Sequence, residues 1–417
     1  MSLAQLKKDA CSAVDDMRAE LLALSHAIHG EPELALEEFK AATRLTDGVE
    51  GHGIAVQREA FGLKTGYAAE FGRSSGPNIA ILSEYDALPG IGHACGHNII
   101  ATAGYGAAIA LSKLGGRLPG RVRYLGTPAE ERFGGKEIMA RAGAFDGTDA
   151  AMMMHPSNQN LITMPCIAIA EVEAIFHGRS AHASAMPYRG LNALDAVVTS
   201  YQAIAQLRQH IRNTDRIHGI ITEGGLAPNI VPERAACRFY VRAVDAHELA
   251  PLKARVQKCF EAGALATGCT LESHWGDTDY LDLKTNWPMA EMYEANAVAI
   301  GREFFPVSEL PPGYAGSTDM GNISHRVPSI HPMLGVAPAG VIIHNPEFTR
   351  YAASPQGDCA VIDGAKSMAM TALDLMGDPA RMAAARADFE ATADLSTAAI
   401  AKSREKMAHA HGGSCCA

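Results

Sequence analysis

The segment 92–98, Gly-His-Ala-Cys-Gly-His-Asn, constrains the fold and chemistry of this chain more than any other. It follows a strand-like apolar run at 78–82 and an acidic turn at 84–89. Two imidazoles and a thiol on a glycine-flanked loop can converge on one cation, because thiolate and imidazole are borderline-soft ligands. The loop therefore predicts a site for a divalent transition metal.

Further candidate ligands lie downstream. Most of them come directly after a strand-like run, and they are Glu130, Glu131, His155 and His344. Ligands of open α/β sheets gather at the carboxyl ends of strands, which favours one shared site. Each residue alone also has a structural interpretation: Cys95 as a small buried hydrophobe, the paired glutamates as a helix start, and His155 as a core histidine. Taken together, the set predicts a metal-dependent hydrolase in which Glu130 is free to act as a base.

On these motifs the chain resembles the aminoacylase/carboxypeptidase metallohydrolases, peptidase family M20. It is most similar to the amidohydrolase branch that carries Cys in place of a bridging Asp. The best-fitting sub-branch has Glu-Tyr-Asp-Ala-Leu-Pro (84–89) before the metal loop. That group includes aminobenzoyl-glutamate hydrolase subunits and dipeptidase-like relatives. Commoner members continue Cys-Gly-His with Asp-x-His, whereas this chain has Asn98 and Ile100 there, which argues against transferring the substrate preferences of auxin-conjugate hydrolases.

The resemblance implies roles for individual residues at the metal site. The implied metal ligands are Cys95, His97, Glu131, His155 and His344. Mn²⁺ and Zn²⁺ both suit this mixed set, and the choice between one ion and two stays open. Glu130 matches the general base that acts on a metal-activated water. Asp86 matches an acidic residue behind the site that orients a ligand.

Three more residues are implied to meet the substrate. His182 resembles a lid histidine that reaches a substrate oxygen, often across a dimer interface, so a homodimer or larger homo-oligomer is expected. Asn229 resembles a substrate-contacting asparagine, and Asp319 lies in a glycine-rich loop near the site. Without the resemblance, these residues would be interpreted as a surface histidine, a turn former and a loop or capping residue.

Length and pattern predict two domains. At 417 residues the chain exceeds the usual size of a single core. Strand–helix alternation predicts an α/β catalytic domain with a mainly parallel mixed sheet flanked by helices, formed by 1–167 and 280–417. The order β-α-β-β-α-β at 168–279 predicts an inserted α+β domain, which the resemblance makes a lid and dimerisation domain. The His- and Cys-containing tail at 409–416 is interpreted as a disordered terminus rather than a metal site.

Composition excludes several classes of partner. The net charge is −10 and no long basic cluster is present, so nucleic acid is not an expected partner. An apolar span of ~20 residues, which a membrane helix needs, is not found, and a secretory signal is not evident at the N-terminus. Nine widely spaced cysteines do not form a disulfide pattern in a chain of this length. We therefore expect a cytoplasmic enzyme that acts on a small molecule.

The expected reaction is hydrolysis of the C–N bond of a small N-acyl or N-aroyl amino acid or a dipeptide-like amide. A deaminase that releases ammonia from an aromatic amine is the alternative, and the complete set of site residues argues against a non-catalytic binding subunit. A substrate carboxylate would need a cationic partner, for which the sequence offers four candidates without singling one out. These are Arg189, Arg234, Arg242 and Arg326.

Overall fold

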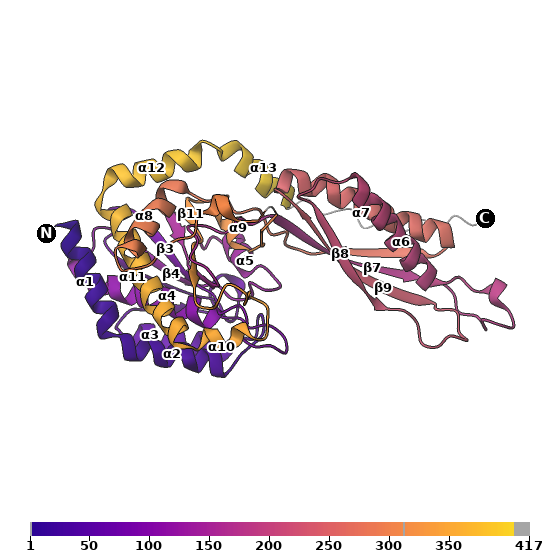
Figure 1. Ribbon diagram of the computed structural model, residues 1–417, viewed down its shortest axis with the longest axis horizontal. Helices are drawn as coiled ribbons and strands as arrows, with labels where there is room; N and C mark the ends of the chain where they lie inside the picture. Colours follow the sequence, from indigo (N-terminus) through magenta and orange to yellow (C-terminus); the bar gives the residue numbers. More distant parts are fainter. Residues whose placement is uncertain (1, 312, 404–417) are drawn as a thin grey trace. The chain divides into compact units, whose positions relative to one another are not determined.

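The computed structural model describes residues 2–311 and 313–403 (Figure 1). They divide into two compact units, of which the first comprises described residues of Met1–Cys166 and Leu283–Ser396. The second comprises Ile167–Asp282 together with residues from Thr397 onward. Residues 397–403, expected in the catalytic domain, thus belong to the second unit, where Ala399 packs with Ala246 and Leu281. The segment 409–416 lies outside the described residues.

A six-stranded mixed sheet forms the centre of the first unit. In the order β1-β2-β4-β3-β5-β11 its strands are Val56–Arg58, Tyr67–Gly72, Arg121–Gly126, Asn78–Ser83, Ala150–Met152 and Ser329–Ile330. The pairings from β4 through β3 and β5 to β11 are parallel, whereas β1 and β2 pair antiparallel. A separate parallel pair joins β6 (His155–Ser157) to β12 (Met333–Gly335). The predicted mainly parallel mixed sheet is confirmed.

Helices cover both faces of this sheet. The helices of this unit are α1 (Leu3–Asp16), α2 (Arg18–Gly30), α3 (Phe39–Gly51), α4 (His97–Ser112), α5 (Gly135–Arg141), α8 (Trp287–Val298), α9 (Met320–Ser324), α10 (Phe348–Ala352), α11 (Pro355–Gly377) and α12 (Pro379–Glu390). Helix α13 (Ala393–Ser403) begins in the first unit and continues into the second. Successive side chains of β3 point to opposite faces, and all are buried. Ile79 and Ile81 join the core of α4 and α11, while Ala80 and Leu82 join that of α5 and α9.

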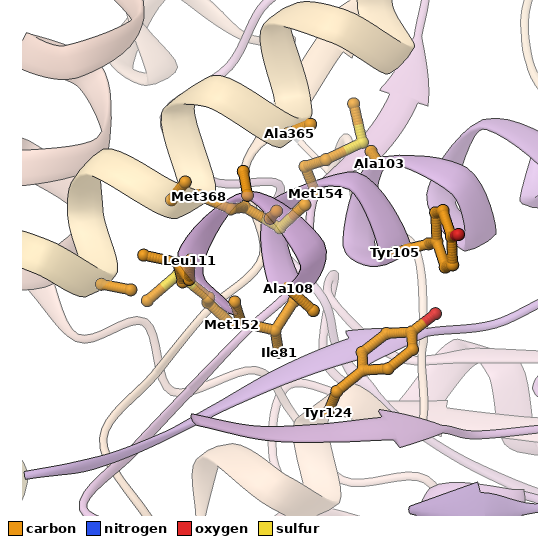
Figure 2. Close-up of a cluster of buried hydrophobic side chains, with 14 of the residues drawn as sticks. Ile81, Ala103, Tyr105, Ala108, Leu111, Tyr124, Met152, Met154, Ala365 and Met368 are labelled. Carbon is orange, nitrogen blue, oxygen red and sulfur yellow. The ribbon is translucent and has the colours of Figure 1, made fainter. Parts of the chain in front are cut away.

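Helix α4 carries the metal loop at its N-terminus and lies against β3. Gly104 permits this close approach, because a Cβ atom there would lie 2.4 Å from Oγ of Ser83 and 2.7 Å from the carbonyl oxygen of Leu82. Figure 2 shows Ala103 of α4 near Ala365 of α11, and Leu111 of α4 near Met368 of α11, in the same buried cluster. The fully buried helix is thus held on the sheet from both sides.

The second unit has the predicted β-α-β-β-α-β order, which is confirmed. Its elements are β7 (Ala168–His177), α6 (Ala193–Leu207), β8 (Arg216–Glu223), β9 (Arg234–Ala243), α7 (Ala246–Thr267) and β10 (Thr270–Trp275). The antiparallel sheet has the order β10-β7-β9-β8, so β8 is an edge strand. Alternate residues of β7 and β9 form one core with α6 and α7, which places both helices on the same face. Single 3-10 turns elsewhere in the chain lie at Ala60–Gly62, Gly115–Arg117, Pro187–Arg189, Arg208–His210 and Val307–Glu309.

Across the described residues, every helix is too short or too polar to cross a membrane.

Candidate metal centre

Segments that follow β3, β4, β5 and β12 bring the sequence-predicted ligands together within the first unit. Two groups of donor atoms share the thiol of Cys95. The first group is Cys95, His97 and His155, and the second is Cys95, Glu131 and His344. Within each group the donor atoms lie within 4.8 Å of one another. Residues up to 249 positions apart, from Cys95 to His344, therefore meet at one point.

Gly96 makes this meeting sterically feasible. Its φ is +79°, and a Cβ atom there would lie 2.5 Å from Cγ of Pro156, the residue after His155. Only glycine combines that backbone conformation with so close an approach. The Sγ atom of Cys95 lies 3.4 Å from Nε2 of His155. The backbone amide of His344 donates to the carbonyl oxygen of Ala94 at 2.9 Å, which fixes the distant loop to the same segment.

The two buried histidines present a lone pair toward the centre. Nδ1 of His97 donates to Oδ1 of Asp86 at 3.1 Å, and Nδ1 of His155 donates to the carbonyl oxygen of Pro156 at 2.7 Å. The Nε2 atoms are therefore unprotonated in the neutral rings, as metal ligation requires. The other oxygen of Asp86 accepts the backbone amide of Glu131 at 2.9 Å, so Asp86 orients two candidate ligands at once.

Three buried polar atoms at the centre have no hydrogen-bond partner among the described residues. They are Nε2 of His97, Oε1 of Glu84 and Oε1 of Glu131. Buried polar groups are normally paired, and these atoms face one another, with Nε2 of His97 lying 3.4 Å from Oε1 of Glu84 and 3.8 Å from Oε1 of Glu131. A divalent cation would satisfy them, so the residues present fit a metal.

The electrostatics of the thiol agree with this fit. Burial alone would raise the pKa of Cys95, but the neighbouring His155 and His97 outweigh burial and hold that pKa well below its usual value. Burial, together with the charge of Cys95, raises the pKa of Glu131 to about 7. The thiolate and the carboxylate are thus compensated by positive charge at the histidines, and a divalent cation held by the same donor atoms would supply that charge in place of protons.

Glu130 lies beside the ligands but belongs to neither group that contains Cys95. It is 8% exposed and forms a third group of donors with Glu84 and His97. Burial raises the pKa of Glu130 well above its usual value, and the charges of Glu84 and Glu131 add to the effect. Glu130 and Glu84 are therefore buried carboxylates that lie beside His97 but outside the two groups that contain Cys95.

Sequence reasoning missed the residues that surround Glu130. Glu84 lies in the acidic turn at 84–89, and Lys136 is the second residue of α5, yet both side chains are fully buried. Nζ of Lys136 forms ion pairs with Glu84 and, at 2.7 Å, with Asp319. His331 was also missed; it packs edge-on against His155 with ring centroids 5.4 Å apart. A lysine in a helix pattern gives no sign of burial, because lysines are almost always exposed.

Asp319, which sequence reasoning placed near the substrate, is fully enclosed. One oxygen accepts Nζ of Lys136, and the other accepts the backbone amide of the same residue at 2.9 Å. Its contacts in the structure are therefore with Lys136.

The second unit holds His182 and Asn229 on neighbouring segments. The amide of Ala183 donates to the carbonyl oxygen of Asn229 at 3.0 Å, and His182 forms a β-bridge with Ile230. Nδ1 of His182 accepts the backbone amides of Ser184 and Ala185 at 3.3 and 3.2 Å. In the neutral ring the proton is therefore on Nε2, and the exposed side chain can donate from that atom.

The four candidate arginines differ in their contacts. Arg326 donates to both oxygens of the buried Glu137 at 2.7 and 2.6 Å, and Arg234 forms an ion pair with Glu223. Nε of Arg242 contacts His218 at 3.3 Å. Among the described residues, Arg189 is the one of these four arginines whose side chain forms no ion pair or hydrogen bond.

Comparisons with known proteins agree with the geometry. Residues 168–267 match the family model described as a peptidase dimerisation domain. The chain is 40% identical over 399 residues to the Xaa-Arg dipeptidase of Mus musculus, covering 92% of each chain. It is 34% identical over 281 residues to one subunit of the p-aminobenzoyl-glutamate hydrolase of Escherichia coli (strain K12), covering 62% of this chain and 58% of that protein.

A solved structure shows the same fold. A dinuclear metal-binding peptidase of the M20 family from Bacillus subtilis superposes with a TM-score of 0.66 at 21% identity, covering 87% of this chain and 99% of that one. Together with the 40% identity over nearly the whole length, this places the chain in a family. The chain belongs to the M20 peptidases, in the amidohydrolase branch of these metal-dependent enzymes that hydrolyse C–N bonds.

Proposed function

We propose that this protein hydrolyses the amide bond of a dipeptide-like substrate with a metal-activated water and Glu130 as general base. The observation that carries the proposal is the sharing of Cys95 between two donor groups, with the buried carboxylate of Glu130 outside both. Glu130 shares a third group with His97 and Glu84, which supports a role for it beside the proposed ligands.

Cys95, His97, Glu131, His155 and His344 are the proposed metal ligands. Two groups that share a thiolate would suit two ions of Mn²⁺ or Zn²⁺. A bound divalent ion would polarise the substrate carbonyl and lower the pKa of water toward ~7. Asp86 would hold His97 and the backbone of Glu131 in place for this purpose.

Glu130 is proposed to take a proton from the attacking water and to deliver it to the leaving nitrogen. A carboxylate whose pKa is raised by burial is suited to both steps near neutral pH. Lys136, paired with Glu84 and Asp319, would keep these two neighbouring carboxylates in fixed positions behind the base.

His182 and Asn229 are proposed to bind the substrate from the second unit. With Nδ1 occupied by two backbone amides, His182 can offer Nε2–H to an oxygen that gains negative charge. Asn229, on the segment paired with His182, would contact the same substrate.

The proposed substrate class is dipeptides with a C-terminal arginine. The relative that shares 40% identity over 92% of this chain is named Xaa-Arg dipeptidase. The net charge of −10 also favours the approach of a cationic substrate. An aminobenzoyl-glutamate substrate, suggested by the name of the second relative, would carry the opposite charge.

A product screen tests this function. The purified protein, loaded with Mn²⁺ or Zn²⁺, would be given Ala-Arg, Ala-Glu, N-acetyl-arginine and p-aminobenzoyl-glutamate, with free amino acid and ammonia measured separately. We expect release of arginine from Ala-Arg, no ammonia, and loss of activity with a chelator. Ammonia as the only product, or full activity in protein shown to be metal-free, would contradict the proposal.

We also propose that the active form is a homodimer or larger assembly. The edge strand β8 exposes Ile220 (64%) and Ile221 (43%), and the family model matched by this unit is that of a dimerisation domain. Strand edges pair readily with their own copy about a two-fold axis. Mixing Glu130→Gln with His182→Ala subunits tests whether His182 serves the neighbouring subunit, because mixed dimers would regain one intact site. Confirmed subunit exchange without any recovered activity would refute shared sites.

The proposed compartment is the reducing cytoplasm. Every cysteine at a described position is a free thiol, which supports that assignment.

A further inference from the structure

Ala129, the residue before Glu130, has an unusual backbone conformation. Its φ is +62°, in the left-handed region that residues with a Cβ atom rarely adopt, and it is completely buried. Its carbonyl oxygen accepts the amides of Phe133 and Gly134 at 3.2 and 3.1 Å, which closes a tight turn after β4. Strain of this kind persists only where the surroundings enforce it.

A carboxylate from a distant part of the chain binds the amide of this strained residue. Oε1 of Glu38 accepts the backbone N–H of Ala129 at 2.9 Å, and the Glu38 side chain is fully buried. Its second oxygen accepts the hydroxyl of Thr65 at 2.8 Å. Two hydrogen bonds, one to each oxygen, therefore fix the orientation of the Glu38 carboxylate.

Glu38 is free for this contact because another residue caps its helix. Glu38 is the N-cap residue of α3, where a side chain often binds the first free amides of the helix. Here Glu33 does so instead, with its carboxylate accepting the amides of Lys40 at 2.9 Å and Ala41 at 3.0 Å. The Glu38 backbone is anchored to α3 through its carbonyl oxygen, which accepts the amide of Ala42 at 2.9 Å.

The turn that carries Glu130 is thus bound by a carboxylate on each side. Glu38 binds the amide of Ala129, and Asp86 binds the amide of Glu131. Glu130 is the residue between them, so the residues before and after it are each held through their backbone amide. We propose that Glu38 is a positioning residue for the general base: it holds Ala129 in its strained conformation and so sets the direction in which Glu130 projects. This inference rests on the proposed role of Glu130.

A double-mutant cycle between Glu38 and Ala129 tests the proposal. The variants are Glu38→Ala, Ala129→Gly and their combination, with Glu38→Gln as the conservative variant and the exposed neighbour Glu37→Ala as the matched control. Glycine adopts positive φ without steric cost, so a chain that carries Ala129→Gly needs Glu38 less. The measurements are kcat, KM, metal content by elemental analysis and urea unfolding of the metal-loaded enzyme.

We expect Glu38→Ala to lower kcat by roughly 10- to 100-fold, the scale of a misplaced general base, with KM and metal content nearly unchanged. Glu38→Gln, which keeps an acceptor for Ala129, should restore much of kcat, and the loss from Glu38→Ala should be several-fold smaller in the Ala129→Gly background. Equal losses in both backgrounds would overturn the proposal, as would an unchanged kcat or metal content that falls in step with activity.

Urea unfolding tests the role of Glu38 independently of the proposed function. Absence of amide hydrolysis in the wild type would refute the function. The link between Glu38 and Ala129 is read independently in the unfolding data, where equal destabilisation by Glu38→Ala in both backgrounds would refute it.

Discussion

Replacing Lys136 with methionine should leave two buried carboxylates without their cation. The ammonium group is completely buried and pairs with both Glu84 and Asp319, which are also completely buried. Removing one partner of a buried ion pair typically costs about 3–5 kcal/mol, because the remaining charge is left unpaired. Here two carboxylates lose the same partner, so we expect a loss of unfolding free energy of at least about 3 kcal/mol.

A second substitution separates the cost of the unpaired charge from the cost of the lost packing. In a Lys136→Met/Asp319→Asn variant one of the two stranded charges is gone, so a substantial part of the lost stability should return. An exposed lysine, Lys8→Met, serves as the control for the removal of a positive charge alone. Each unfolding free energy would be measured by urea denaturation at pH 7, with metal present and with a chelator.

Two outcomes would contradict the role of Lys136 as a buried counter-ion. A loss below about 1 kcal/mol, the range of a solvated surface pair, would show that Lys136 is not the counter-ion that holds Glu84 and Asp319. A double variant that is less stable than Lys136→Met would show that packing, rather than the unpaired charge, dominates the cost.

Three further predictions follow from individual contacts at the site. Glu130→Gln should keep its metal while kcat falls about 10²–10⁴-fold, whereas Cys95→Ala should lose metal. Enzyme kinetics and elemental analysis measure both effects. Near-normal turnover of Glu130→Gln would exclude Glu130 as the base. Gly96→Ala should lower both metal content and thermal stability, because its Cβ atom would lie 2.5 Å from Pro156 at a φ of +79°; an unchanged metal content would contradict this. Burial, aided by the charge of Asp86, raises the pKa of Glu38 from 4.5 to about 7, so its protonation stabilises the fold below about pH 4.5 and this contribution is lost as pH rises through 7. The unfolding free energy of Glu38→Gln minus that of the wild type should therefore rise by about 2 to 3 kcal/mol from pH 5 to pH 8. Urea denaturation at both pH values measures this difference, and a difference that does not change with pH would refute the prediction.

Much of the fold follows from local pattern. Buried strands such as 78–83 and 121–126 are continuous apolar or alternating runs, and their helices have clear periodicity, so the order of elements could be predicted. The antiparallel strands β1 and β2 could not be predicted. β1 has only three residues, none of them buried, and half of β2 is not buried, so neither has a period that distinguishes it from a loop.

Residue types and their order along the chain predict a metal site, and the family resemblance implies which residues would be its ligands. A thiol, imidazoles and carboxylates placed after successive strands can be recognised as a ligand set, because parallel strands end at one edge of a sheet. Gly96 helps to bring Cys95 and His155 together, because no other residue could adopt its backbone conformation so close to Pro156.

Only the tertiary structure decided what surrounds those ligands. Lys136 and Asp319 are 183 positions apart, and Glu38 and Ala129 are 91 apart, with nothing local in either pair to indicate a partner. A charged side chain is expected in water until its counter-charge is known, and that counter-charge comes from packing of distant segments. Candidate ligands could thus be named from residue type, order along the chain and family resemblance, whereas the groups that hold them in place depend on contacts that form only when the whole chain has folded.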